Sequence, residues 1–152
     1  MNPKSPPELA GHPIFISLPV QWGDQDAFGH VNNVVYFRWM ESARIEYFRQ
    51  GQLGAAAANQ GAGPILASIK CDFRRQLGHP DTVLVSASIA SIGRTSMKMV
   101  HLVYSTVQQA VAAEGESVIV MFDYQAQRPI LVADEIRGKI EALEGRSGQL
   151  PK

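Results

Sequence analysis

The sequence predicts an α+β domain in which a five-stranded, mostly antiparallel sheet wraps around one long helix. Two observations carry this prediction: one long helical segment, residues 33–50, follows the first strand, and four further strand-like segments come after it. A helix with an extensive apolar face needs a sheet to cover it, so one layer of each is the simplest arrangement. At 152 residues, without an internal repeat, the chain fits a single domain.

The ends of the chain are expected to lie outside this domain. The first residues are rich in proline and polar side chains, so we expect a flexible tail over residues 1–12, the domain over 13–143 and a second flexible tail over 144–152. The first strand is expected at residues 14–22. Pro19 cannot donate a ladder hydrogen bond and therefore indicates an edge strand or a bend.

The long helix is expected over residues 33–50. Apolar side chains recur there at near-helical spacing: Val34, Phe37, Met40, Ile45 and Phe48. Asn32 or Asn33 is a suitable N-cap, and Gly51 a plausible stop. The alanine-rich tract 54–58 predicts a second, short helical turn, which the Gly- and Pro-containing residues 61–64 end.

The rest of the chain is expected to be mostly strand. Runs rich in β-branched residues, separated by turn signals, predict four strands at residues 65–73, 82–92, 96–106 and 116–124. In the third of these, the alternation places Met97, Met99 and His101 on one face, and we expect His101 to pack in the core or an interface. A short polar helix is expected over residues 133–143.

Composition excludes several classes of function. The net charge is zero, with 45% hydrophobic and 18% charged residues, so nothing favours binding to nucleic acid or an anionic membrane. The N-terminus lacks the apolar core of a signal peptide, and no window reaches the roughly 18 apolar residues of a membrane span. The single cysteine, Cys71, lies in an apolar run and fits a buried position in a reducing compartment. We therefore expect a cytoplasmic protein.

The segment between the first strand and the helix carries the strongest functional signal. It places Asp24 and Asp26 in a Gly-containing loop, and the helix begins seven residues after Asp26. A carboxylate close to the unpaired N–H groups of a helix start suits chemistry at a carbonyl, since the N–H groups can hold the developing oxyanion. The simpler interpretation is that these aspartates only cap turns, where aspartate is common.

Three groups of residues together resemble the hotdog-fold acyl-CoA thioesterases of the 4-hydroxybenzoyl-CoA thioesterase-like family. They are Trp22-Gly23-Asp24-Gln25-Asp26 at the strand end, Gly29-His30-Val31-Asn32-Asn33 in the loop, and Tyr36 to Arg44 on the helix. The resemblance covers roughly residues 14–125. Ala27 and the Asn32-Asn33 pair depart from the 4-hydroxybenzoyl-CoA prototype and look more like general acyl-CoA thioester hydrolases.

The resemblance implies specific roles for the loop and the helix start. Asp26 would be the catalytic carboxylate, acting either as nucleophile or as general base, and the backbone N–H of Asn33, helped by that of Val34, would polarise the thioester carbonyl. Glu41 is the second candidate, because another branch of hotdog thioesterases uses a helix carboxylate at a similar place. Its simpler role is a surface pair with Arg44.

Residues expected to bind the substrate follow from the same resemblance. They are Gly29, His30, Val31 and Tyr36 near the reacting group, with Phe28 and Trp39 as further acyl-pocket walls, and Arg94 and Ser96 for coenzyme A. Arg74, Arg75 and Lys98 are weaker candidates for the phosphates of coenzyme A. No cofactor and no metal are expected, and coenzyme A enters only as part of the substrate.

The resemblance further implies a homodimer or homotetramer with active sites between subunits. Three other functions stay open: an acyl-carrier-protein thioesterase, a hotdog hydratase or dehydratase using His30 and Glu41, and a non-catalytic acyl-CoA-binding dimer. The main expectation is hydrolysis of an acyl-CoA thioester to the free acid and coenzyme A.

Overall fold

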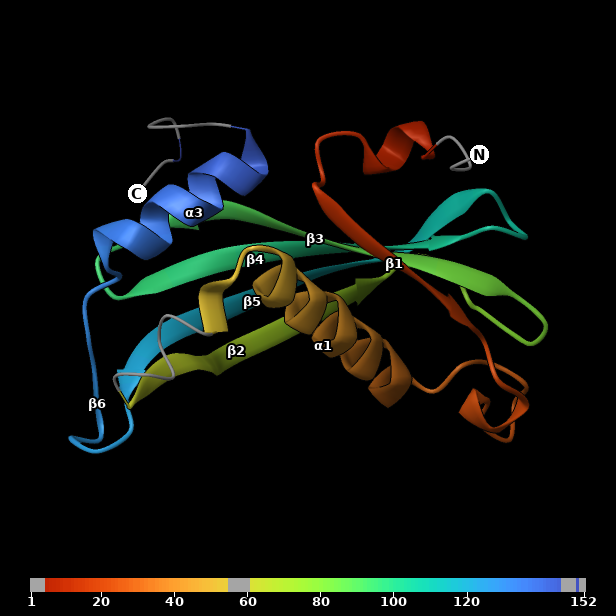
Figure 1. Cartoon of the computed structure of the whole chain (residues 1–152). Coiled ribbons are helices and arrows are strands. Elements are labelled where there is room, and N and C mark those ends of the chain that lie inside the picture. The colour runs from red at the N-terminus through yellow and green to blue at the C-terminus, as the bar shows by residue number, and fades with distance from the viewer. Residues whose placement is uncertain (1–4, 55–60, 146–149, 151–152) are drawn as a thin grey trace.

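A computed structural model describes residues 5–54, 61–145 and 150 of the chain. Its elements are η1 (Pro7–Leu9), β1 (Ile14–Pro19), η2 (Trp22–Asp24), α1 (Asn33–Gln50), β2 (Ala62–Phe73), β3 (Thr82–Ile92), β4 (Ser96–Ser105), β5 (Ala110–Asp123), β6 (Arg128–Pro129) and α3 (Asp134–Glu144). Five of the strands form a curled sheet with α1 lying across its concave face (Figure 1). The α+β prediction is confirmed.

The described strands form one sheet in the order β1-β3-β4-β5-β2, with the short β6 added to the end of β5. Every pairing is antiparallel. The register shifts once in each of the β2–β5, β3–β4 and β4–β5 pairs, and such irregularities increase the local twist that lets a sheet curl. β1 is an edge strand whose last residue is Pro19, as the missing N–H of that proline predicted.

Helix α1 has the predicted bounds, but its buried face differs from the predicted stripe. The buried residues are Val35, Tyr36, Trp39, Met40, Ala43, Arg44 and Tyr47, which repeat every three to four positions. Val34 and Ile45 are instead 66% and 59% exposed. The helix is apolar on more than one side, and its large aromatic side chains occupy the side that faces the sheet. Periodicity alone could not choose between the two faces.

A glycine of the sheet accommodates the middle of α1. A Cβ atom added at Gly115 of β5 would lie 2.5 Å from both Sδ and Cε of Met40, a fully buried side chain of the helix. The absence of a side chain at Gly115 therefore allows the helix to sit close to the sheet.

Helix α3 is tied to the rest of the domain through its last residue. Glu144 accepts hydrogen bonds from the Tyr47 hydroxyl (2.7 Å), the Ser88 hydroxyl (2.9 Å) and the Ile89 N–H (2.5 Å). Leu9 of η1 and Leu150 are buried as well. Leu9, Glu144 and Leu150, which were expected to belong to flexible tails, are therefore packed against the domain.

Three strand bounds differ from the prediction by three residues or more, and the first is the end of β1, at Pro19 instead of Trp22. β5 begins at Ala110 instead of Glu116, and β2 at Ala62 instead of Ile65. Both extensions consist of Ala, Gly and Pro together with few β-branched residues, and pairing with a neighbouring strand overrides their weak strand propensity. Of the predicted helical turn at 54–58, residues 55–58 lie outside the described residues. None of the described helices has the length and apolarity needed to cross a membrane.

Candidate active site

The loop between β1 and α1 is held in place by its own backbone and by the loop before β3. The Asp26 N–H donates to the His30 carbonyl at 2.8 Å, and the Gly29 N–H donates back to the Asp26 carbonyl at 3.1 Å. Gly29 has φ +77°, a left-handed conformation that favours glycine. The Val31 N–H donates to the Leu77 carbonyl at 2.8 Å, which fixes this loop against the start of the neighbouring one.

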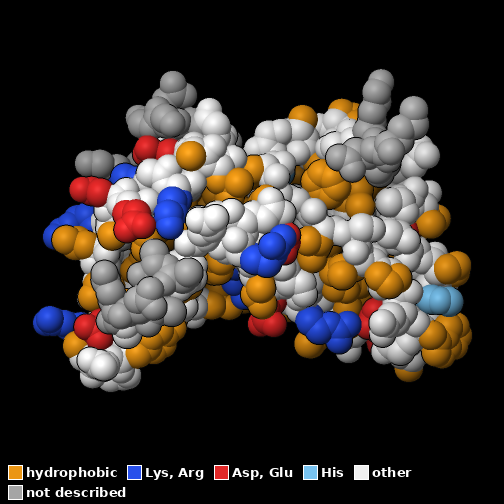
Figure 2. All heavy atoms as spheres, viewed as in Figure 1, with side chains coloured by type: hydrophobic (Ala, Val, Ile, Leu, Met, Phe, Trp, Pro, Cys, Tyr) orange, Lys and Arg blue, Asp and Glu red, His pale blue; other side chains and the backbone are white. Residues whose placement is uncertain are grey.

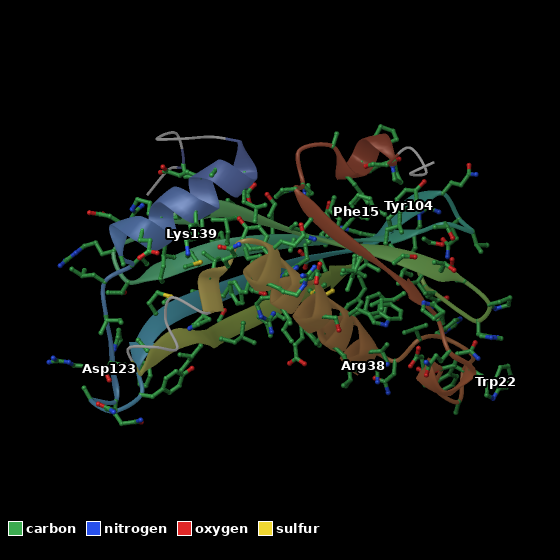
Figure 3. All side chains as sticks on the ribbon, in the orientation of Figure 1. Phe15, Trp22, Arg38, Tyr104, Asp123 and Lys139 are labelled. Atoms are coloured by element: carbon green, nitrogen blue, oxygen red, sulfur yellow. The ribbon has the colours of Figure 1, made fainter. Side chains whose placement is uncertain are left out.

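Asp24 has a structural role. It is 6% exposed, its Oδ2 accepts the Gln21 N–H at 2.9 Å, and its Oδ1 pairs with Arg38 Nη2 of α1 at 2.9 Å. Its backbone carbonyl accepts the Asn32 N–H at 2.9 Å. One carboxylate oxygen therefore joins the loop to α1 and the other closes the turn that begins at Gln21, so the turn-forming interpretation of Asp24 agrees with the structure. Figure 3 shows Arg38 on the side of α1 nearest the loop that carries Trp22.

Asp26 uses only one of its two carboxylate oxygens for hydrogen bonds within its own turn. Oδ1 accepts the Phe28 N–H at 2.9 Å and, more weakly, the His30 N–H at 3.4 Å. Among the described residues, no group donates a hydrogen bond to Oδ2. The first oxygen thus caps a turn, as the simpler interpretation expects, and in doing so fixes the carboxyl group while the second oxygen stays available.

The start of α1 leaves one N–H group available. Asn32 is the N-cap, and its side chain accepts the Val34 N–H at 3.0 Å, while its carbonyl accepts the Val35 N–H at 2.9 Å. The Asn33 N–H has no acceptor within the described part of the chain. Val34, expected to assist as a second donor, therefore has its N–H engaged by the cap, and Asn33 is the donor that remains.

Asp26 and Asn33, the residues that carry these two groups, line the same cavity. Its volume is about 460 Å³, and its walls are formed by Asp26, His30, Val31, Asn33, Tyr36, Phe73, Arg74, Arg75 and Gln76. Four of the expected site residues besides Asp26 are therefore brought together with it: His30, Val31, Asn33 and Tyr36. A volume of this size lies in the range of small-ligand sites.

The wall behind the cavity is aromatic and closely packed. Tyr36 is 3% exposed and packs against Phe73 of β2 with a ring distance of 4.9 Å and against Trp39 at 5.3 Å. Burial, with a smaller contribution from the nearby Cys71, raises the pKa of Tyr36 to about 12, so its phenol stays protonated at neutral pH. Trp39 was expected to form a wall of the acyl pocket. It lies instead in the core, behind Tyr36, and does not line the cavity.

The end of β2 contributes a wall that the sequence did not predict. Phe73 and Gln76 were not singled out, while Arg74 and Arg75 were considered only for the phosphates of coenzyme A. The signal available in the sequence was a pair of arginines between a strand and a Gly-Pro loop. The packing of Phe73 on Tyr36 and the shared cavity show that this point lies beside Asp26.

Other expected residues lie elsewhere. Arg94 and Ser96 are at the β3–β4 turn, whereas the Asp26 loop contacts Leu77 and His79, just before the opposite end of β3. Eleven residues of β3 separate the two ends, which is roughly 35 Å of extended strand. Figure 3 likewise shows Asp123 and Trp22 at opposite ends of the molecule. Within one protomer, Arg94 and Ser96 therefore do not reach the Asp26 cavity.

Glu41 and Phe28 are also separate from the Asp26 cavity. Glu41 lines a second cavity of about 290 Å³, together with Arg44 of α1 and residues of β2. Phe28 is 85% exposed at the tip of its turn. His30 and Glu41, the pair that a hydratase would need, thus lie in different cavities.

The described residues contain no group of three or more His, Cys, Asp and Glu side chains arranged to hold a metal ion.

Hydrophobic side chains gather at the end of the molecule that carries the loop (Figure 2), where Trp22 and Phe28 are exposed.

The sequence profile of the thioesterase-like superfamily matches residues 20–140, a span that includes the loop, α1 and every strand from β2 to β6. The chain belongs to the thioesterase-like superfamily. This membership agrees with the hotdog fold expected from the sequence, and the superfamily's activity identifies the chain as a thioester hydrolase.

Known thioesterases are similar to this chain, two of them compared as solved structures and one by sequence. A Thermus thermophilus thioesterase, solved in complex with coenzyme A and Zn, is 34% identical, with a TM-score of 0.79 over 90% of this chain and 98% of that one. The Pseudomonas aeruginosa PA2801 protein, described as a putative thioesterase, is 30% identical, with a TM-score of 0.72 over 83% and 95% of the two chains. The Arabidopsis thaliana chloroplastic acyl-acyl carrier protein thioesterase ATL3 is 24% identical over 82% of this chain and 65% of its own length.

Proposed function

We propose that this thioesterase hydrolyses acyl-CoA thioesters, with Asp26 as the catalytic carboxylate and the Asn33 N–H as the oxyanion donor. The observation that carries the proposal is that Asp26 and Asn33 line the same cavity, and that among the described residues one carboxylate oxygen of Asp26 and the N–H of Asn33 have no hydrogen-bond partner. The acyl carbon would lie between them, with its carbonyl oxygen at the helix start. A well-placed N–H of this kind contributes about 3–4 kcal/mol to the stabilisation of an oxyanion.

Two balanced routes use this arrangement. In the first, Asp26 takes a proton from water as the water oxygen bonds to the acyl carbon; the C–S bond then breaks, and the thiolate of coenzyme A takes up a proton. In the second, an Asp26 oxygen bonds to the acyl carbon and expels the thiolate, and water then hydrolyses the resulting anhydride. Both routes give the free acid and the thiol of coenzyme A. One turnover in heavy-oxygen water distinguishes them, because only the anhydride route can leave the label in Asp26.

The test of Asp26 has a matched control two residues away. Asp26→Asn is expected to lower kcat by about 10²- to 10⁴-fold, the usual contribution of a general base, without lowering stability. Asp24→Asn is expected to lower the free energy of unfolding by about 1–3 kcal/mol, because it weakens bonds to Gln21 and Arg38, and to lower kcat far less than Asp26→Asn does. Thiol release from a panel of acyl-CoAs and urea unfolding measure the two effects. Wild-type turnover by Asp26→Asn would exclude Asp26 as the catalyst.

The match to ATL3 supports a second carrier for the acyl group, the acyl carrier protein. The same cavity chemistry would apply, since both carriers present the acyl group as a thioester. Comparing hydrolysis of one acyl group on coenzyme A and on acyl carrier protein decides between the two. The coenzyme A bound in the Thermus thermophilus thioesterase supports coenzyme A as the carrier.

A homodimer would bring the coenzyme A residues to the site. β2 is the longer edge strand of the sheet and runs from the Arg94 end to the Asp26 end. If the β2 strands of two protomers pair antiparallel, Arg94 and Ser96 of the second copy come to the same end as Asp26 of the first. This arrangement reconciles their expected role with their distance from Asp26 within one chain.

A further inference from the structure

The wall that the end of β2 gives to the Asp26 cavity carries two guanidinium groups with different surroundings. Arg74 Nη2 pairs with Glu114 Oε2 of β5 at 3.0 Å, so its charge is compensated by a neighbouring strand. Arg75 forms no ion pair and no side-chain hydrogen bond with any residue that the structure describes. Of the two arginines that line the cavity, Arg75 is therefore the one whose side-chain donors are unused within the described part of the chain.

The backbone that carries Arg75 is fixed. The N–H groups of Arg74 and Arg75 both donate to the Ala112 carbonyl, at 2.8 and 3.0 Å, directly after β2 ends at Phe73. The Phe73 ring packs on Tyr36 of α1, the helix whose first turn supplies the Asn33 N–H. Arg75 is thus attached to a wall whose position is set relative to the proposed reacting groups, although its own side chain is exposed.

The place of Arg75 restricts which anion it can bind. The reacting carbonyl, under the proposed function, occupies the space between Asp26 and Asn33. The phosphates of coenzyme A are separated from the sulfur by the whole pantetheine arm, whereas Arg75 lines the same cavity of about 460 Å³ as Asp26 and Asn33, beside the reacting carbonyl. An anion within reach of Arg75 in this cavity therefore belongs to the acyl part of the substrate.

We propose that Arg75 binds an anionic group at the far end of the acyl chain, so that the enzyme prefers acyl thioesters carrying a second carboxylate. A guanidinium binds a carboxylate through paired N–H donors, and this geometry selects a carboxylate over a methyl group of similar size. This proposal rests on the proposed function, because the site of reaction determines which part of the substrate Arg75 can reach.

The experiment compares dicarboxylyl-CoAs with monocarboxylyl-CoAs of the same chain length, for example glutaryl-CoA with valeryl-CoA, at several lengths. The parent is expected to prefer the dicarboxylyl member of at least one pair. Arg75→Gln should lower kcat/KM for that substrate on the order of tenfold, as befits an exposed ion pair with good geometry, and leave its neutral partner within about twofold. Arg75→Lys should retain part of the preference. Arg128→Gln, which alters an exposed arginine on β6, serves as the matched control and should change neither value.

Several outcomes would overturn the proposal. One is a parent enzyme without any preference for the dicarboxylyl substrates; another is an Arg75→Gln variant that keeps the parental preference. An equal loss for charged and neutral acyl-CoAs would show that Arg75 acts on Asp26 or on the coenzyme. Thioesters of N-acetylcysteamine, which lack phosphates, distinguish these two, because only the phosphate contact disappears with them. Failure of the proposed function has a different signature, namely unchanged hydrolysis of both substrate classes by Asp26→Asn.

Discussion

Asp24 and Asp26 differ in role because their surroundings differ. Asp24 is buried and has a partner for each oxygen, one on the backbone and one on Arg38, so it contributes to the position of the loop. Asp26 is exposed and uses one oxygen to hold its own turn, which leaves the other for a substrate or a water. The first carboxylate thereby keeps the second in register with the start of α1.

Buried His101 predicts a dependence of stability on pH. It is 1% exposed, and since a carbonyl only accepts, its Nδ1–H donates to Ser86 O at 3.0 Å while Nε2 accepts the Ser117 hydroxyl at 2.9 Å. Burial, and then the charges of Arg44 and His12, lower the pKa of His101 to about 4, against the opposing effect of Ser86.

The folded protein therefore binds the His101 proton less readily than the unfolded chain, whose histidine titrates near ~6.5. The contribution of neutral His101 to the free energy of unfolding should be fully present above about pH 6.5. It should be lost progressively as the pH decreases toward 4, by up to about 3 kcal/mol. His101→Gln should flatten this decline between about pH 6.5 and 5, as measured by urea unfolding at each pH. An unchanged slope in the variant would assign the decline to other groups.

At the scale of the elements, the packing of α1 on β5 depends on Gly115. Gly115→Ala should lower the free energy of unfolding by about 1–3 kcal/mol, since the new methyl group overlaps the end of Met40 in a closed core. The loss should be smaller in a Met40→Leu background, which a double-mutant cycle measures.

Gly138→Ala is the control, because Gly138 is exposed on α3 with nothing within 4 Å of an added Cβ. That substitution should stabilise the helix by about 0.5–1 kcal/mol. Equal losses from both glycine substitutions would contradict the assigned contact between Gly115 and Met40.

Sequence patterns predicted the elements well where local signals were strong. The bounds of α1 and β3 were predicted residue for residue, from an Asn cap and a β-branched run. The start of β5 and the buried face of α1 were not, because both depend on what packs against them. At the site, Asp26, Asn33, His30, Val31 and Tyr36 line one cavity, since they come from one short segment, and their roles stay predictions. The wall from Phe73 to Gln76 depends on pairing between distant strands, which the sequence does not show.

For the molecule as a whole, the free edge of β2 predicts self-association. A long unpaired edge is normally covered, and Leu66 of β2 and Ile45 of α1 are exposed large apolar residues, 42% and 59% accessible. Leu66→Lys combined with Ile45→Lys should leave the fold intact and convert a dimer to a monomer, measured by light scattering after size-exclusion chromatography. Loss of acyl-CoA hydrolysis in the same variant would fit a site that needs Arg94 of a second copy. A double variant with the parental mass would exclude this edge as the interface.

The division of the cavity between two parts of the chain has a consequence for how such an enzyme changes. Asp26 and Asn33 lie within one stretch of eight residues, braced by that stretch's own turn, whereas the opposing wall arrives from the end of a remote strand. Substitutions at positions 73–76 are therefore expected to change the acyl preference while the proposed catalytic pair, Asp26 and Asn33, stays in place. The substrate preference of such an enzyme can thus evolve through substitutions at four adjacent positions.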